Sequence, residues 1–236
     1  MPALINNARS RGDVYGATAL QLRIAFNAAL VRDDPRGAME DIQAAETSWS
    51  QQEFLLQHYW SLMARLDILA YEGNGPAALA LISRQWPQLA AAQLLRVQFS
   101  VVESHYRRGR SALMCAFDLP AGSSQRRDVL KQVRQDARTL TREGAEWSAG
   151  LGGLLFAGAA HADERTDEAR ECLRRAEQRF AAAGMALHVA ACRRARGRLV
   201  GGDEGQGMIA ESDDWYRTQR VLNPAAFDRM IAGWND

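Results

Sequence analysis

The feature of this sequence that most constrains its fold is a recurring unit of two amphipathic segments joined by a short turn. In the first unit the turn is Asp33-Asp34-Pro35, in which Asp34 is suited to capping the second helix and Pro35 to its first turn. A pair of this kind has one apolar face that it cannot bury alone, so neighbouring pairs must stack to build a core. The sequence therefore predicts an array of helical hairpins.

The second segment of each pair carries a small alanine that is followed four residues later by a larger apolar residue. A four-residue spacing places both side chains on one face of a helix. The three alanines are 40 and then 91 residues apart, and the pairs are Ala38 with Ile42, Ala78 with Ile82, and Ala169 with Leu173. The array resembles tetratricopeptide repeats, whose second helix opens with a small Ala and has an aromatic or aliphatic residue four positions on.

Helix boundaries follow from the apolar spacing and from the turn residues between segments. Over 14–31 one apolar stripe is predicted, made of Leu20, Ile24, Ala28 and Val31. The only candidate linker, Leu119–Ser124, is too short to separate independent domains, so we expect one domain over 1–236 with sub-halves 1–118 and 124–236. The predicted helices are 2–10, 14–31, 35–48, 54–72, 76–84, 91–117, 124–142, 146–161, a helix carrying Ala169 to Phe180, 185–200 and 206–218.

The composition favours helices over strands. The chain has 41 Ala and 25 Leu against 10 Val and 7 Ile, and the first two are strong helix formers whereas the last two favour sheets. We therefore expect an all-α protein, a right-handed tetratricopeptide-like solenoid of antiparallel helical hairpins.

Charge, cysteine content and hydropathy bound the environment of the chain. With 29 basic and 28 acidic residues the net charge is +1, without the basic excess typical of nucleic-acid-binding domains, so no nucleic-acid partner is expected. The three cysteines are far apart and form no C-x-x-C pair, which favours small apolar packing residues in a reducing compartment. No basic, apolar leader and no run of about 18 uninterrupted apolar residues is present, so we expect a cytoplasmic protein without a membrane span.

Motifs for catalysis are missing from the sequence. Of the 29 basic residues, 28 are Arg and only Lys131 is Lys, in a polar helical context, which excludes P-loop and kinase-type phosphate binding. The four histidines are isolated from one another, so no metal site is predicted, and no G-x-S-x-G elbow is present. We expect no enzyme activity, no catalytic residues and no cofactor.

Several longer strings, spread over nearly the whole chain, carry a second resemblance. They are Gly12-Asp13-Val14-Tyr15, Trp49-Ser50-Gln51, Leu56-Gln57-His58-Tyr59-Trp60, Leu94-Leu95-Arg96-Val97-Gln98-Phe99, Gly201-Gly202-Asp203-Glu204-Gly205 and Asn223-Pro224-Ala225. These strings resemble the helical region that follows the kinase domain in some bacterial serine/threonine protein kinases. The resemblance implies a regulatory, partner-binding or signal-binding array that is attached to a kinase or separate from it.

One group of side chains is a candidate binding site. In a stacked array the first helices line the concave face, so polar and aromatic groups on them would converge in a groove. Arg96 would hold a peptide carboxylate or an acidic ligand there, while the amides fix the peptide backbone. The alternative interpretation places Trp60 in the core and the two glutamines at neighbouring helix turns. The six candidate residues are Gln57, His58, Trp60, Arg96, Gln98 and His105.

Two clusters of arginine could also bind phosphate or RNA through their forked guanidinium groups. Acidic residues lie close to both clusters, among them Glu103, Glu168, Glu171 and Glu177, so we interpret them as charge-balanced, solvated helix faces. The clusters are Arg107, Arg108 and Arg110, and Arg193, Arg194, Arg196 and Arg198.

The predicted function is non-catalytic recognition of a protein or peptide partner in bacterial kinase signalling. A first alternative is a small-molecule sensor with a closed pocket between the two halves on either side of Pro120. A second alternative is self-association as a homodimer through exposed apolar residues near the C-terminus, namely Phe227, Met230 and Trp234. Trp234 could equally cap the end of the solenoid.

Overall fold

The computed structural model describes residues 2–47, 49 and 53–234, and these contain helices and turns without a strand. A π-helical turn over Gln21–Ala25 joins the second helix to the third, and a 3-10 turn over Leu94–Arg96 precedes the seventh. The α-helices are α1 (Pro2–Ser10), α2 (Val14–Leu20), α3 (Phe26–Val31), α4 (Pro35–Glu46), α5 (Leu56–Tyr71), α6 (Gly75–Ala91), α7 (Gln98–Asp118), α8 (Ser124–Arg142), α9 (Glu146–Ala162), α10 (Thr166–Ala182), α11 (Ala186–Val200), α12 (Gly202–Thr218) and α13 (Pro224–Ala232).

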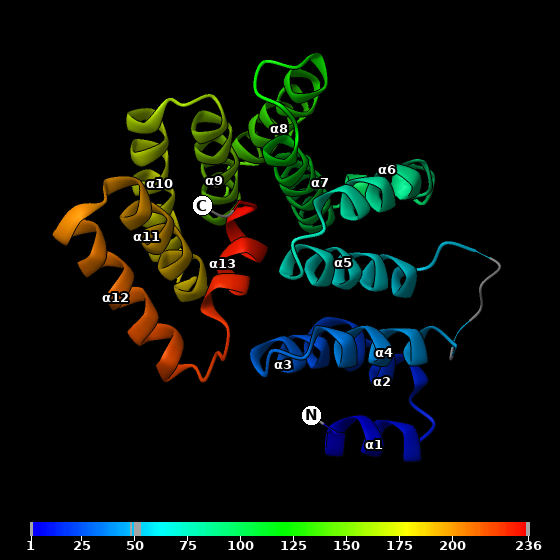
Figure 1. Ribbon diagram of the computed structural model, residues 1–236. Helices are drawn as coiled ribbons and strands as arrows, with labels where there is room; N and C mark the ends of the chain where they lie inside the picture. The colour runs from blue at the N-terminus through cyan, green and yellow to red at the C-terminus, as the bar shows by residue number, and fades with distance from the viewer. Residues whose placement is uncertain (1, 48, 50–52, 235–236) are drawn as a thin grey trace.

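The helices α1 to α12 follow one another in an arc and pack mainly against their neighbours in sequence (Figure 1). The first helices of successive pairs also pack together, as α5 does with α7 and α7 with α9. The last helix, α13, lies on the inner side of the arc, where it contacts α5, α9 and α11 (Figure 1). The all-α prediction and the packing of sequence neighbours are confirmed.

The small alanines of the second helices are fully buried in the array. Ala38, Ala78 and Ala169 are each 0% exposed, and so are the larger residues four positions on. An alanine lets the backbones of two helices approach closely, while the larger residue one turn later fills the space beside it. Asp34 and Asn74 cap α4 and α6 through bonds from the backbone amides of Gly37 and Ala77, as expected for Asp and Asn before a first-turn proline.

Two predicted helix boundaries around residue 90 are wrong. Helix α6 runs past Pro87 to Ala91 instead of ending at Arg84, and the fully buried Leu89 holds the turn that follows the proline. The next helix starts at Gln98 rather than at Ala91, because Gln93 has a left-handed backbone with φ of 58°. No glycine marks that break, so the sequence carries no local signal for it.

The apolar stripe predicted for 14–31 is also wrong. Ile24 is 46% exposed, whereas the buried face is formed by Leu22, Phe26 and Leu30. A π-turn contains one more residue than an α-turn and therefore rotates the following residues around the helix. The turn over Gln21–Ala25 shifts the buried face in this way.

The C-terminal residues that were expected to be exposed are buried. Phe227 and Met230 on α13 are each 4% exposed and Trp234 is 3% exposed. Trp234 lies against His161 of α9 on the inner side of the arc, so it does not cap the end of the array. The helix itself was missed, although Asn223 followed by Pro224 is a typical helix start, and the predicted apolar surface for self-association is absent from this segment.

Among the described helices, the stretch Val14–Val31 near the N-terminus has the length and apolar composition needed to cross a membrane. In the fold, 39% of this stretch is buried. Core helices of soluble proteins pass the same test, so the absence of a membrane span stays a prediction. Cys115 and Cys192 are buried and Cys172 is partly buried, and all three are free thiols, as expected for packing residues.

Candidate functional site

A cleft of about 280 Å³ opens on the inner side of the arc. Its floor is formed by α5 and α7, which contribute Met63 and Tyr106 among others. One wall comes from the π-turn and α3, with Leu22 and Phe26, and the opposite wall comes from α11 and α13, with Leu187 and Ile231. Residues from the two ends of the chain therefore meet across this cleft.

Charged side chains of α5 and α7 form an ion-pair network at the floor of the cleft. Arg107 binds Asp67 with two parallel bonds, 3.0 Å from Nε to Oδ1 and 2.7 Å from Nη2 to Oδ2. Arg110 donates to the same carboxylate, 2.8 Å from Nη2 to Oδ1. Burial by itself raises the pKa of a carboxyl group, but Arg107 and Arg110 outweigh that effect and hold the pKa of Asp67 below its ordinary value.

The second carboxylate of the cleft, Glu103, is also engaged. Tyr59 donates its hydroxyl proton to Glu103, with 2.9 Å between the oxygens, and Arg107 forms an ion pair with Glu103 at 3.4 Å. Burial and the neighbouring Glu103 carboxylate raise the pKa of Tyr59 above its ordinary value, so its hydroxyl remains protonated at neutral pH. Both acids of the cleft are therefore held by donors of the protein itself.

Helix α13 is fixed to the cleft by hydrogen bonds to its last carbonyl groups. Arg110 donates from Nη1 to the Met230 carbonyl at 2.5 Å, and the Tyr106 hydroxyl donates to the carbonyl of Ile231. On the outer side of the same helix Arg229 donates to the Tyr71 carbonyl at 3.0 Å. A positively charged donor at a helix C-terminus satisfies carbonyls that lack partners within the helix.

Four residues, Tyr15, Arg23, Trp60 and Phe99, form an aromatic–arginine rim beside the cleft. Arg23 and Trp60 line the cleft, and Tyr15 and Phe99 contact these two side chains from outside its lining. The Arg23 Cζ atom is 5.6 Å from the ring centre of Trp60 and 5.9 Å from that of Phe99. Tyr15 packs against Trp60 with 5.5 Å between ring centres. Tyr15 and Phe99 are 55% and 46% exposed, so the rim presents aromatic surface to solvent. Arg23 lies on the π-turn, a local distortion that is frequent at functional sites.

His188 of α11 faces the cleft from the opposite wall. Burial, followed by the positive charge of Arg107, lowers the pKa of His188 to about 4. Its ring packs against Phe180 with 4.8 Å between ring centres. At neutral pH the imidazole is therefore uncharged and offers one donor and one acceptor.

No family model, curated protein or solved structure matches the chain. Within the described residues, no group of three or more His, Cys, Asp and Glu side chains is placed to hold a metal ion.

The structure brings only one of the six predicted site residues into the cleft. That residue is Trp60, which is 8% exposed and packs with both the core and the rim. Arg96 is exposed on the 3-10 turn, where it contacts Gln93 with 3.4 Å between Nη1 and Oε1, and Gln98 donates to the Glu143 carbonyl at 2.9 Å. The structure therefore does not bring these groups together in this cleft, and their role in binding stays a prediction.

The two predicted histidines lie in separate environments. His58 accepts a bond from the Leu55 amide at 3.0 Å and lines a different cavity, of about 400 Å³, between α4, α5 and α6. His105 is bonded to Asp136 at 2.6 Å. Gln57, next to His58, is partly buried on α5 and does not line the cleft.

The arginine clusters are paired with acids, as predicted, but they are less solvated than predicted. Arg108 binds Asp136 at 2.6 Å, and Arg194 binds Asp228 at 2.7 Å. Arg110 is only 1% exposed, so it belongs to the interior rather than to a solvated face. The sequence analysis did not identify Arg23, Asp67 and His188 as cleft residues. The one sequence signal for the ion-pair network of α5 and α7 was the four-residue spacing of Glu103 and Arg107, which is typical of a helical ion pair.

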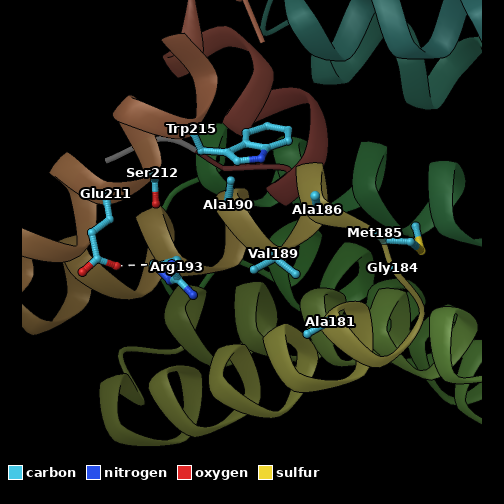
Figure 2. Close-up of a pocket in the computed structure, with 10 residues that line it drawn as sticks. All are labelled: Ala181, Gly184, Met185, Ala186, Val189, Ala190, Arg193, Glu211, Ser212 and Trp215. Carbon is cyan, nitrogen blue, oxygen red and sulfur yellow. Dashed lines mark hydrogen bonds and ion pairs between the residues drawn. The ribbon is translucent and has the colours of Figure 1, made fainter. Parts of the chain in front are cut away.

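A second pocket, of about 240 Å³, lies between α10, α11 and α12 (Figure 2). Figure 2 shows Trp215 above Ala186 and Ala190, with Val189 and Ala181 below. Its charged side chains, Arg193 and Glu211, form an ion pair at 3.2 Å. The pocket is therefore mainly apolar, whereas the cleft combines apolar walls with charged groups.

Proposed function

We propose that this chain is a non-catalytic recognition module, a right-handed tetratricopeptide-like solenoid that binds a short segment of a protein partner in the cleft. The observation that carries the proposal is the aromatic–arginine rim beside the cleft, in which Arg23 and Trp60 line the cleft and Phe99 adds exposed aromatic surface. Aromatic residues and arginine are the residue types that dominate binding energy at protein interfaces. The resemblance to regions following bacterial serine/threonine kinase domains supports a role in that signalling.

The chemistry of the cleft supports binding rather than catalysis. Asp67 and Glu103 are both held in ion pairs, so neither carboxylate is free to act as a general base. His188 has no hydrogen bond to a nucleophilic side chain of the described chain. In a recognition role, the paired charged side chains and His188 would act as fixed hydrogen-bonding groups and as surface against which a partner packs.

Selection from a phage-displayed peptide library, followed by calorimetry with the enriched peptides, tests this function. We expect Phe99→Ala to weaken binding by about tenfold or more, since an exposed aromatic residue of a binding surface often contributes above 1.4 kcal/mol. Leu222→Ala is the matched control, because Leu222 is 69% exposed and lies outside the rim. Failure to enrich any peptide, or equal loss in both variants, would contradict the proposal.

The second candidate function is a small-molecule sensor. The observation that favours it is the origin of the cleft lining, which comes from both halves of the chain: α3, α5 and α7 from the first and α11 and α13 from the second. Its volume of about 280 Å³ is close to the lower end for small-ligand pockets, roughly 300 Å³. The sensor would be favoured if a small metabolite raised the unfolding temperature, if Arg23→Gln removed this effect, and if no peptide were enriched.

The association with kinase signalling has its own test. An in-frame kinase domain upstream in the coding sequence, or a kinase gene beside it, would support the association. Absence of both would contradict the association with kinase signalling. The binding function would then still be tested by the peptide experiment above.

A further inference from the structure

We infer that the cleft recognises a carboxylate on the partner segment, an acidic side chain beside a large apolar one, with Arg23 as the anchoring residue. The inference rests on the proposed function and names the chemistry of the segment that would bind. It is carried by the position of Arg23, by the charge balance of the cleft and by the shape of its apolar walls.

Arg23 is a positioned guanidinium without an acidic partner. Its Cζ atom lies 5.6 and 5.9 Å from the ring centres of Trp60 and Phe99, so two aromatic rings flank the group. Contact with aromatic faces orients a guanidinium while its N–H groups remain free to bind a carboxylate with two parallel bonds. The Arg23 side chain forms no ion pair or hydrogen bond with the described residues, although many other arginines of the chain are paired.

The charges that line the cleft do not cancel. Its lining contains the guanidinium groups of Arg23, Arg107 and Arg110 but only the carboxylates of Asp67 and Glu103. Arg107 and Arg110 are both committed to these two acids, which leaves the charge of Arg23 uncompensated. His188 is neutral near pH 7 and adds no charge. An incoming monoanion would complete the balance, whereas a cationic group would be repelled.

The walls beyond the rim suit an apolar side chain next to the acid. Phe26, Met63, Leu187 and Ile231 line the cleft behind Arg23 and Trp60. The volume of about 280 Å³ accommodates one large side chain rather than a whole helix, and α13 already lies beside it. One unpaired guanidinium and one excess charge match a carboxylate more closely than a doubly charged phosphate.

Blocked, dye-labelled heptapeptide pools with uncharged random flanks test this inference by fluorescence anisotropy. The central pairs are Glu-Phe, Gln-Phe, Glu-Ala and phosphoserine-Phe, so that glutamate supplies the only carboxylate. We expect the Glu-Phe pool to bind about tenfold more tightly than the Gln-Phe or Glu-Ala pool, because each of these lacks one of the two recognised groups. The phosphoserine pool should bind no more tightly than the Glu-Phe pool.

Arg23→Gln should abolish the preference for Glu over Gln, and Arg23→Lys should restore part of it through charge alone. Arg36→Gln is the matched control, since Arg36 lies on α4 with an 89% exposed side chain, and it should keep the full preference. Unchanged thermal unfolding of the Arg23 variants shows that folding is intact, as expected for an exposed residue without a hydrogen bond.

The possible results separate the inference from the proposed function. If the Glu-Phe and Gln-Phe pools bind equally, or Arg23→Gln keeps the preference, the carboxylate inference is wrong while peptide binding stands. Tighter binding of the phosphoserine pool also overturns it. If no pool binds, peptide recognition fails. Thermal unfolding with 3-phenylpropionate and with 3-phenylpropionamide then tests whether the cleft binds the carboxylate of a small ligand. If 3-phenylpropionate stabilises the protein, the amide does not, and Arg23→Gln removes the effect, the carboxylate inference holds for a small ligand. If neither compound stabilises the protein, the inference is wrong.

Discussion

Arg110 of α7 donates to the carboxylate of Asp67 on α5, with 2.8 Å between Nη2 and Oδ1, and its side chain is 1% exposed. The same guanidinium reaches the Leu66 carbonyl at 3.2 Å and the Met230 carbonyl of α13 at 2.5 Å. One buried side chain therefore connects the N-terminal half of the array to the last helix. A buried charge of this kind is tolerated because both terminal nitrogens have acceptors and one of these is a carboxylate, and removal of that carboxylate leaves the charge uncompensated.

Asp67→Asn is expected to destabilise the fold strongly. The substitution leaves Arg107 and Arg110 without their shared counter-charge, and breaking a buried pair typically costs about 3–5 kcal/mol. Urea unfolding measures the loss. Asp214→Asn is the matched control, because the Asp214 side chain is 68% exposed in its pair with Arg217, and exposed pairs contribute about 0–1 kcal/mol. A loss below about 1 kcal/mol for Asp67→Asn would show that the network is structurally dispensable.

The hairpins could be predicted from the sequence because their signals are local. Caps such as Asp34 and spacings such as Ala78 to Ile82 depend on residues within one or two turns. The π-turn before α3 and the left-handed Gln93 could not be predicted, because neither position carries a residue type that demands its conformation. Their conformations depend on tertiary contacts rather than on local preference.

The cleft could be predicted only in part, since it is assembled from distant segments. Trp60 could be found because it is aromatic and belongs to one of the recognised strings. Arg23 and His188 could not, because they line the cleft from opposite ends of the chain. One side of the cleft is formed by α13, which packs against α5 and α11. The sequence analysis expected the segment that carries Met230 at a free surface, so this side of the cleft could not be predicted. A sequence pattern indicates the buried face of a helix, but not which distant helix covers it.

His188 should make the protein less stable as the pH drops from about 6.5 to about 4. The pKa of His188 is about 4 in the folded protein and about 6.5 in an unfolded chain, so the unfolded state binds the proton first. The stability that the neutral His188 contributes is therefore fully present above pH 6.5 and is lost through this window, by on the order of 2 kcal/mol for a partly buried ring. Urea unfolding of His188→Gln at several pH values should give a flatter profile than the wild type. Parallel profiles would contradict this role.

The crossing of α11 and α12 should depend on Gly205. A Cβ atom at Gly205 would lie 2.2 Å from the carbonyl oxygen of Gly197, a backbone group that cannot move aside. Gly205→Ala should therefore destabilise the protein by about 1–3 kcal/mol, as overpacking does. Gly207→Ala in the same helix meets nothing within 4 Å and should stabilise it by about 0.5–1 kcal/mol through helix propensity. Equal effects of the two substitutions in urea unfolding would show that the close approach has no energetic consequence.

The pocket of Figure 2 follows from that crossing, and filling it should stabilise the protein. Because α12 approaches α11 at Gly205 and has no extensive contact with α10, an apolar space remains below Trp215. Ala186→Leu extends a side chain into this space, and we expect a gain of about 0.5–1.5 kcal/mol in the free energy of unfolding. Ala182→Leu, an exposed position of α10 outside the pocket, should change it by less than about 0.5 kcal/mol. A loss of stability in Ala186→Leu, with Ala182→Leu neutral, would mean that Trp215 cannot accommodate the added side chain.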